Sequence, residues 1–282
     1  SLHIDGFVSA LGANASTSNG GGGSGGSILV QAYNFSGHGT LDASGGRGLG
    51  NGGGGSGGRI ATLIGRQNNF GGQYLAHGGY SSSGPGGPGT IYKYESRRGP
   101  SYRELKYNPR LNITEIKPEH SKLTVENSDL TTSNPAVVME ENSLYYEFDE
   151  VQVEGYSYVH FYHPNGANRV TVIIHELTGN EKGMVRVQDR QQVLIHFVES
   201  THTYFDAPCG FYVDQGGELV LPTTVVISSQ KAVLEGRLVG VEELIIERGA
   251  EFILQGYAHT QSVKSLQLWY TDILGNSYTP GY

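Results

Sequence analysis

A repeat of about 33 residues constrains the fold of this chain more than any other feature of its sequence, and repeats of this length are typical of solenoids, propellers and other arrays of stacked units. The octet Asn-Gly-Gly-Gly-Gly-Ser-Gly-Gly occurs at 19–26 and again at 51–58. A second pattern keeps nearly the same step, because Gly6, Ala10 and Gly12 recur at positions 39, 43 and 45 and again at positions 72, 76 and 78.

The C-terminal part contains a different repeat with the same step. Segment 211–221 aligns without a gap with 244–254, at the offset that separates the copies of the second glycine pattern. Apolar residues align with apolar residues, acidic residues with acidic residues, and Gly216 with Gly249. The alignment predicts that the two segments are stacked copies of one element.

Short runs rich in β-branched and aromatic residues indicate strands. Examples are 158–162, 193–197 and 233–239. No stretch shows sustained helical periodicity, which disfavours helical solenoids such as ankyrin arrays. A step of this length accommodates three short strands and three turns. The sequence therefore predicts an all-β fold, a right-handed parallel β-helix (β-solenoid) with glycine-rich turns, whose handedness follows the general bias of parallel crossovers.

Glycine is concentrated in the first part of the chain, where residues 1–100 hold 30 of the 43 glycines. We expect the octets to form tight corners, where φ is positive and stacked coils leave little room for Cβ atoms. A flexible Gly/Ser linker would not keep a constant register with the strands between its copies. A bundle of glycine-rich polyproline-II strands is the alternative structure for residues 1–99.

These patterns divide the chain into three segments. Residues 1–99 are expected to form glycine-rich coils, and residues 100–210 an aromatic-rich region that continues the solenoid. Residues 211–282 are expected to form regular coils cut from a longer array. The chain starts at Ser1 without a recognisable leader, which we interpret as a mature chain or a piece of a longer one.

The order GGGGSGGSI (20–28), FSGHGTLDASGG (35–46), GGGGSGGRI (52–60) and GPGTIY (87–92) resembles glycine-rich modules that are repeated in very large surface or matrix proteins of animals and some unicellular eukaryotes. The pattern of segment 217–247 is similar to the β-solenoid coils that follow those modules. The resemblance implies an extracellular structural or adhesive role, with matrix proteins, cell-surface proteins or glycans as partners. It implies no defined catalytic activity.

Charge and hydropathy exclude two classes of partner. The chain has 27 acidic and 19 basic residues, and the basic residues are scattered, so it lacks the positive surface that nucleic acid requires. Aliphatic runs such as 170–174 are far shorter than the ~20 residues of a membrane-spanning helix. The single cysteine, Cys209, excludes an internal disulfide and a cysteine-based zinc site.

Three Asn-X-Ser/Thr tripeptides are candidate glycosylation sites. They begin at Asn14, Asn34 and Asn112. In a secreted protein such asparagines accept glycans on the surface. With the resemblance, they support an extracellular location.

Several catalytic motifs match this sequence only because it is rich in glycine. Ser24 and Ser56 each lie in a G-x-S-x-G sequence, yet no helix is expected after either one, and a nucleophile would not occur twice at a repeat interval. Glycoside hydrolysis needs two carboxylates across the scissile bond. The adjacent acids at 149–150 and 242–243 would point to opposite faces of a strand. We therefore predict no catalytic residue, and a polysaccharide hydrolase or lyase is the weakest alternative.

No metal or cofactor site is expected. His160 and His163 are three residues apart on an expected strand, so their rings would point to opposite faces. Calcium is retained as a weaker alternative, because acidic residues are present but no loop has a recognisable calcium-binding spacing.

Aromatic residues supply the candidate ligand contacts. Tyr156 and Tyr158 could belong to an exposed stripe that stacks on sugars, which would make the chain a carbohydrate-binding module. Aromatic ladders within the solenoid are the favoured alternative. Stacked coils with unprotected ends also associate end to end, so self-association is a further expectation.

Overall fold

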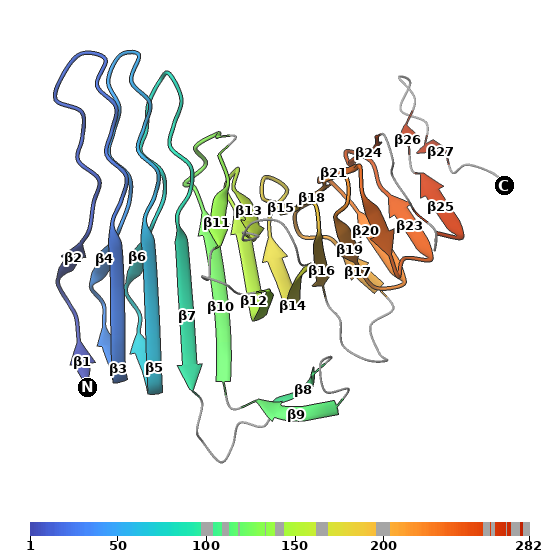
Figure 1. The fold of residues 1–282 in the computed structure, drawn as a ribbon, viewed down its shortest axis with the longest axis horizontal. Coiled ribbons are helices and arrows are strands. Elements are labelled where there is room, and N and C mark those ends of the chain that lie inside the picture. Colours follow the sequence, from blue (N-terminus) through green and yellow to red (C-terminus); the bar gives the residue numbers. More distant parts are fainter. Residues whose placement is uncertain are drawn as a thin grey trace. The chain divides into compact units, whose positions relative to one another are not determined.

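The computed structural model describes residues 1–96, 104–108, 113–117, 119–132, 134–138, 144–161, 169–195, 204–255, 260, 263–268, 270–271 and 277–278. Within these ranges the regular elements are all β-strands, and most strand pairs are parallel (Figure 1). The prediction of an all-β fold with parallel sheets is confirmed.

The chain forms two compact units. Unit 1 consists of Ser1–Val137 and Phe148–Tyr158, and unit 2 consists of Val138–Glu147 and Val159–Tyr282. Neither of the expected segment boundaries, after residue 99 and after residue 210, coincides with the division between the units. We describe each unit separately.

Unit 1 is built from two stacks of strands, parallel except for the antiparallel pair β7 and β10, and from a separate antiparallel pair of strands. Its strands are β1 (Leu2–His3), β2 (Phe7–Ser9), β3 (Ser27–Gly37), β4 (Thr40–Asp42), β5 (Arg59–Phe70), β6 (Gln73–Leu75), β7 (Thr90–Ser96), β8 (Glu104–Asn108), β9 (Ile113–Lys117) and β10 (Glu119–Glu126). It also includes most of β12 (Tyr145–Glu154). The neighbours are β1-β3-β5-β7-β10-β12 in one sheet and β2-β4-β6 in another, while β8 and β9 pair antiparallel.

The strand register of unit 1 confirms the step predicted for the glycine-rich part. Leu2 is paired with Phe35, and Thr40 is paired with both Phe7 and Gln73, so residues one repeat apart lie side by side in neighbouring layers. The core between the two stacks contains Phe35 and Leu41, which are almost completely buried. The ring of Phe35 stacks on that of Phe70 in the next layer, with centroids 4.4 Å apart, as expected for an aromatic ladder.

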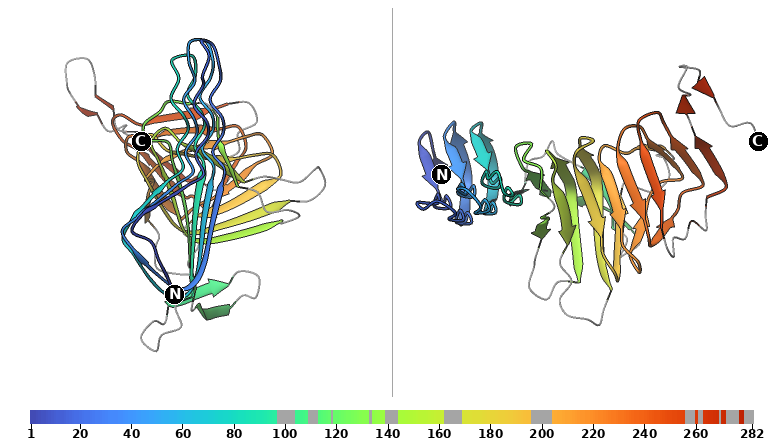
Figure 2. Two further views of the ribbon diagram at one scale, coloured as in Figure 1. Left: turned by 90° about the vertical axis from the view of Figure 1, so that its left-hand side faces the viewer. Right: turned by 90° about the horizontal axis from the view of Figure 1, so that it is seen from above.

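The glycine segments are long extended legs, and the expectation that they form tight corners is wrong. Each layer leaves its short strand along an outgoing leg (10–15, 43–48 or 76–81) and comes back along a returning leg (20–26, 52–58 or 84–89). Figure 1 shows these legs rising beyond the strands, and in Figure 2 they overlie one another. Equivalent legs bond in parallel, and outgoing and returning legs bond antiparallel.

Hydrogen bonds between the glycine legs recur every third residue. Gly22 and Gly25 donate their amides to the returning leg of the next layer, and Gly54 and Gly57 do the same one layer later. A β-ladder has a side-chain period of two, whereas a polyproline-II helix has three residues per turn and leaves its amides for neighbouring chains. This spacing supports the polyproline-II alternative for the legs.

Close approach of backbones, more than turn geometry, requires glycine here. A Cβ atom on Gly25 would lie 1.8 Å from the carbonyl oxygen of Ala43, and one on Gly55 would lie 1.9 Å from the carbonyl oxygen of Gly23. Neither backbone can move without breaking the bonds of its own layer. A left-handed conformation is needed at Gly50, which lies between the outgoing and returning legs of the second layer and has a φ of 57°.

A side chain terminates the stack of glycine legs. Gly12 donates its amide to Ser44 and Gly45 donates its amide to His77, but the equivalent Gly78 donates to the side-chain oxygen of Asn127, 2.7 Å away. The amide nitrogen of Asn127 donates in turn to the carbonyls of Gly86 and Leu130. The buried carboxamide therefore takes the place of a further glycine layer.

Unit 2 is a stack of three-strand coils. Its strands are β14 (Val170–Gly179), β15 (Met184–Val187), β16 (Gln191–Ile195), β17 (Tyr204–Asp206), β18 (Gly210–Val213), β19 (Glu218–Val220), β20 (Thr224–Ile227), β21 (Lys231–Leu234), β22 (Arg237–Val239), β23 (Glu243–Ile246), β24 (Glu251–Leu254), β25 (Ser265–Leu268), β26 (Tyr270–Thr271) and β27 (Ser277–Tyr278). The short strands β11 (Ala136–Val138) and β13 (Tyr158–Phe161) have residues in both units.

From β15 to β24, successive strands of unit 2 join three parallel sheets in turn. One contains β14-β16-β19-β22, a second β15-β18-β21-β24 and a third β17-β20-β23-β25, while β26 and β27 pair antiparallel. The coils of the last part are much shorter than a glycine layer, since Tyr204 pairs with Thr224 and Thr224 with Glu243. Inward residues such as Val225 and Leu244 are buried.

The predicted stacking of 211–221 on 244–254 is wrong. Phe211 pairs with Ala232, and Leu244 pairs with Val225 and Leu266. The two segments look alike because each is a strand, a turn containing a glycine with positive φ, and a second strand. The two segments begin with strands of different sheets, and those strands are five apart in the chain. Since a coil has three strands, five strands amount to one coil and two thirds of the next. The chain needed for this happens to be as long as one glycine layer, so the shared step is accidental.

Candidate ligand-binding groove

The serines of the G-x-S-x-G matches stabilise the stack. The Ser56 hydroxyl donates to the Ser24 hydroxyl of the layer before it, at 3.0 Å, and both residues are exposed. The repeat predicts that the two serines occupy equivalent positions in neighbouring layers, and this direct contact agrees with it.

The adjacent acids have different partners, and Glu242 lies in a bend just before β23, not in the strand. In β12, the carboxylate of Asp149 accepts from the backbone and hydroxyl of Ser121, whereas Glu150 accepts from Lys122 at 2.6 Å. Glu242 pairs with Lys264 at 2.7 Å, and the Thr224 hydroxyl donates to Glu243 at 3.3 Å.

The histidines do not assemble a metal site among the described residues. His175 is buried, and its Nε2 lies 2.9 Å from a carboxylate oxygen of Glu147. Burial and the charge of Arg186 lower the pKa of His160. His163 lies outside the described residues. In the part of the chain that the structure covers, no three His, Cys, Asp or Glu side chains come close enough to hold a metal ion.

The candidate glycosylation sites differ in environment. Asn14 is exposed, and its side-chain oxygen accepts from the Arg47 amide at 2.8 Å. Asn34 is half-buried in β3, and its amide nitrogen donates to the Ser1 hydroxyl at 3.1 Å. Asn112 lies outside the described residues. Glycosylation at these positions stays a prediction.

The two tyrosines singled out from the sequence do not share a strand face. Tyr156 lies in a bend with a φ of 55° and is 38% exposed, whereas Tyr158 is half-buried at the start of β13. The alternation of strand side chains that placed them together does not apply to a bend. Their role in ligand binding stays a prediction.

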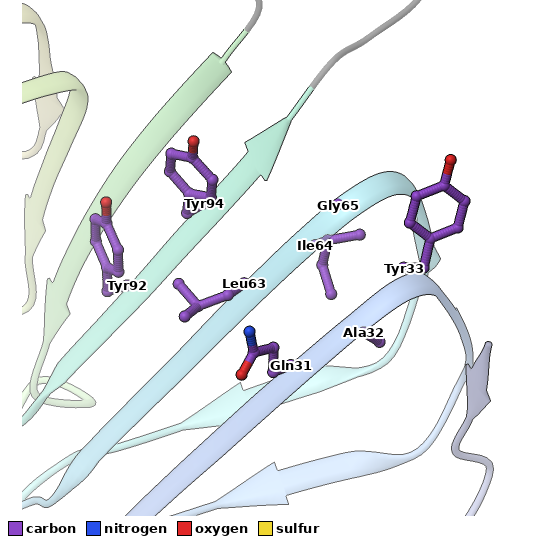
Figure 3. Close-up of a pocket in the computed structure, with 8 residues that line it drawn as sticks. All are labelled: Gln31, Ala32, Tyr33, Leu63, Ile64, Gly65, Tyr92 and Tyr94. Atoms are coloured by element: carbon purple, nitrogen blue, oxygen red, sulfur yellow. The ribbon is translucent and has the colours of Figure 1, made fainter.

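An open groove lies elsewhere in unit 1, on the outward face of β3, β5 and β7. Its volume is about 610 Å³. It is lined by Gln31, Ala32, Tyr33, Leu63, Ile64, Gly65, Tyr92 and Tyr94. Figure 3 shows Tyr33 at one side, Tyr92 and Tyr94 at the other, and Leu63 between them.

The parallel register brings these side chains together. Gln31 is paired with Leu63, and Leu63 is paired with Tyr94, so the three form one row across the strands. Gly65 leaves room for the ring of Tyr33, because a Cβ atom there would lie 3.2 Å from that ring. The guanidinium of Arg66 lies 5.9 Å from the centre of the same ring.

The face that carries the groove becomes a core face farther along the same sheet of unit 1. β7 and β10 pair antiparallel, and Tyr92 lies opposite Leu123, which is 2% exposed. Leu123 in turn pairs with the fully buried Val151. The ring of Tyr92 meets the ring of Phe148 edge to face, 6.3 Å between centroids, at this border. The groove is thus an open part of a sheet face that is core-like farther along.

Alternation along β7 directs charged residues to the other face. Lys93 lies between the two groove tyrosines in sequence, and its ammonium lies 3.7 Å above the ring of Tyr74 on the inner side. Burial, followed by the charge of Lys122, lowers the pKa of Lys93. Burial also raises the pKa of Tyr74 to about 12. The eight groove-lining residues therefore include no charged side chain.

The comparisons with known proteins identify no relative: no family model, no curated protein and no solved structure matches the chain. In the described ranges, the structure contains no helix long and apolar enough to cross a membrane.

Sequence reasoning missed the groove. The alternation Tyr92-Lys93-Tyr94 was a usable signal together with Gln31-Ala32-Tyr33, because the two runs lie on strands two layers apart in the stack. The side of the sheet on which the tyrosines lie depended on the strand register, which the repeat alone did not specify.

Proposed function

We propose that this chain is a stiff structural and adhesive element of an extracellular surface or matrix assembly, built as a right-handed parallel β-helix. Its partners would be matrix proteins, cell-surface proteins or glycans, and its ends would associate with further copies. The observation that carries the proposal is the bonding between the glycine layers of unit 1.

Backbone groups join each glycine layer to the next, along both legs and across them. Gly46 donates to Gly23 of the layer before, and Gly55 donates to Gly46, so bonds run through the stack. Because no side chain separates the backbones, a layer cannot move without breaking several bonds together. Rigid layers of this kind suit a spacer that holds its partners apart.

The extracellular part of the proposal is tested by glycan analysis. The intact mass of protein isolated from its native source would be measured before and after enzymatic deglycosylation. We expect a loss of mass that maps to Asn14, Asn34 or Asn112, and unmodified asparagines at all three positions would contradict secretion through a glycosylating pathway.

The mechanical part is tested by pulling single molecules of the full chain from end to end. We expect the glycine layers of unit 1 to resist until they open in one high-force event. Gradual extension of residues 1–96 at low force would contradict a role as a stiff spacer.

Carbohydrate binding is the second candidate function, and the groove on β3, β5 and β7 favours it. A polysaccharide-active enzyme gains no support from this groove, because the lining residues include neither Asp nor Glu to act as acid or nucleophile.

A further inference from the structure

We propose that the groove on the outward face of β3, β5 and β7 binds a neutral, extended polysaccharide through Tyr33, Tyr94, Leu63 and Gln31. The inference does not depend on the mechanical role proposed above.

The lining matches the two kinds of surface on a sugar ring. The axial C–H bonds of a pyranose form an apolar face that packs on the electron-rich face of an aromatic ring. Tyr33 is 61% exposed at one side of the groove, Tyr94 lies at the other, and Leu63 lies between them (Figure 3). The Gln31 amide and the Tyr33 hydroxyl can donate to and accept from sugar hydroxyls.

The charge of the lining selects a neutral ligand. No Lys, Arg, Asp or Glu is among the eight residues. A carboxylate or sulfate placed between Leu63 and Tyr94 would lose water without a cationic partner among the lining residues, since the guanidinium of Arg66 lies over the ring of Tyr33 at the other side of the groove. A neutral glycan suffers no such loss, so acidic polysaccharides are expected to bind more weakly.

The dimensions match a short stretch of a longer chain. β5 separates β3 from β7, so the two outer strands lie roughly 10 Å apart. Tyr33 lies two residues beyond the row of Gln31, Leu63 and Tyr94, so Tyr33 and Tyr94 stand roughly 12 Å apart. This separation is close to the length of a disaccharide. A volume of about 610 Å³ lies within the usual range of small-molecule sites, and the groove is open to solvent along the sheet.

A peptide is a poorer occupant of the same groove. β3 pairs with β1 and β5, and β5 pairs with β3 and β7, so the strands that carry the groove are not sheet edges to which a further strand could add. A second copy of this chain could only lie across the face, and the experiment below separates that outcome.

Calorimetric titration of the full chain tests the proposal. The probes are the neutral hexasaccharides cellohexaose, laminarihexaose and chitohexaose, with an oligogalacturonate as the acidic comparator. We expect saturable binding of at least one neutral probe and weaker binding of the acidic one. Tyr33→Ala and Tyr94→Ala are each expected to weaken binding about tenfold.

Tyr80→Ala is the matched control. Tyr80 is also exposed in unit 1, at 53%, but it lies on a glycine leg beneath the guanidinium of Arg47 and outside the groove. Its variant is expected to bind the sugar as the unchanged chain does. Tyr33→Phe keeps the ring and removes the hydroxyl, so retained binding in that variant assigns the contact to stacking.

Three results would overturn the proposal. They are no saturable binding of any neutral probe, unchanged binding in both Tyr33→Ala and Tyr94→Ala, and tighter binding of the acidic comparator. Dimerisation that Tyr33→Ala abolishes, seen in sedimentation equilibrium without sugar binding, would instead assign the face to a second copy. If Tyr94→Ala disturbs folding, the exposed Tyr33 still decides the question.

Discussion

The glycine layers of unit 1 and the three-strand coils of unit 2 are two ways of stacking a chain on itself. In unit 1 a layer spans one full glycine repeat, and the stack is joined largely by backbone groups that touch where no side chain intervenes. In unit 2 a coil is shorter, and its three sheets enclose a core of Val, Ile and Leu. The first arrangement depends on the absence of side chains, and the second depends on their volume.

The largest effect is expected when one methyl group is added to a glycine leg of unit 1. In Gly55→Ala the new Cβ would lie 1.9 Å from a carbonyl oxygen of the layer before, so we expect unit 1 to lose more than about 3 kcal/mol of stability or to fail to fold. Hydrogen exchange followed by mass spectrometry would measure this loss in peptides from residues 1–96.

Gly53→Ala is the control, on the same leg two residues earlier. Its Cβ would lie 3.6 Å from the Gly84 oxygen, which is an ordinary contact. We expect a change within about 1 kcal/mol, because alanine also restricts the unfolded chain. Equal effects of the two substitutions would contradict close backbone approach as the reason for glycine.

The second prediction addresses unit 2, where deletion of side-chain volume should matter most. Leu244→Ala removes a side chain that is 2% exposed and is expected to cost about 3 kcal/mol. Leu254→Ala, at 56% exposure, is expected to cost less than about 1 kcal/mol. Urea unfolding monitored by exchange in residues 204–255 would compare them, and similar losses would argue against a packed core.

The third prediction concerns the residue that ends the glycine stack. In Asn127→Asp, an oxygen replaces the nitrogen that donates to the Gly86 and Leu130 carbonyls, so we expect a loss of about 2 kcal/mol near neutral pH. Protonation of the new carboxylate would restore a donor, so the loss should shrink in acid.

Asn14→Asp serves as the control for this change of charge. The Asn14 side chain accepts from the Arg47 amide, and a carboxylate accepts equally well. Thermal unfolding of both variants would be measured, and destabilisation by Asn14→Asp as large as that by Asn127→Asp would remove the special role of the carboxamide.

The last prediction concerns the only cysteine, whose effect near neutral pH is expected to be the smallest, and it tests how tightly unit 2 is closed. Cys209 is fully buried, and burial raises the pKa of its thiol from 9.0 to about 12. The folded state therefore keeps a proton that the unfolded state releases, and stability should fall as pH rises from about 9 toward 12. Near pH 8 we expect no change in stability and very slow alkylation by iodoacetamide.

Mass spectrometry would follow that alkylation with and without denaturant. Rapid labelling of the denatured chain is the positive control. Labelling of the native chain at a comparable rate would show that the coil around Cys209 opens readily.

Local sequence patterns predicted the strands well and the glycine legs poorly. Runs rich in β-branched and aromatic residues identified strands such as β13, whereas the run 233–239, expected to be one strand, is divided between β21 and β22. Glycine-rich sequence is compatible with corners, linkers and polyproline-II legs alike. The choice at Gly25 or Gly55 depended on the backbone of another layer.

The groove shows the same limit in a functional setting. Tyr33 and Tyr94 are far apart in the sequence and meet one groove through two strand pairings. Tyr156 and Tyr158 looked better placed in the sequence, but a bend at Tyr156 breaks the alternation on which that expectation rested.

The sequence by itself determined the all-β class, the step of the glycine layers and the equivalence of Ser24 and Ser56, because a repeat records which residues occupy the same place in successive layers. Only the tertiary structure decided that shorter coils produce the resemblance between 211–221 and 244–254, that Asn127 ends the glycine stack, and that one sheet face turns from groove to core between β7 and β10. The reason is that strand pairing is a contact between distant residues. Patterns along the chain specify which side chains alternate, and the pairing partner decides which side becomes the interior.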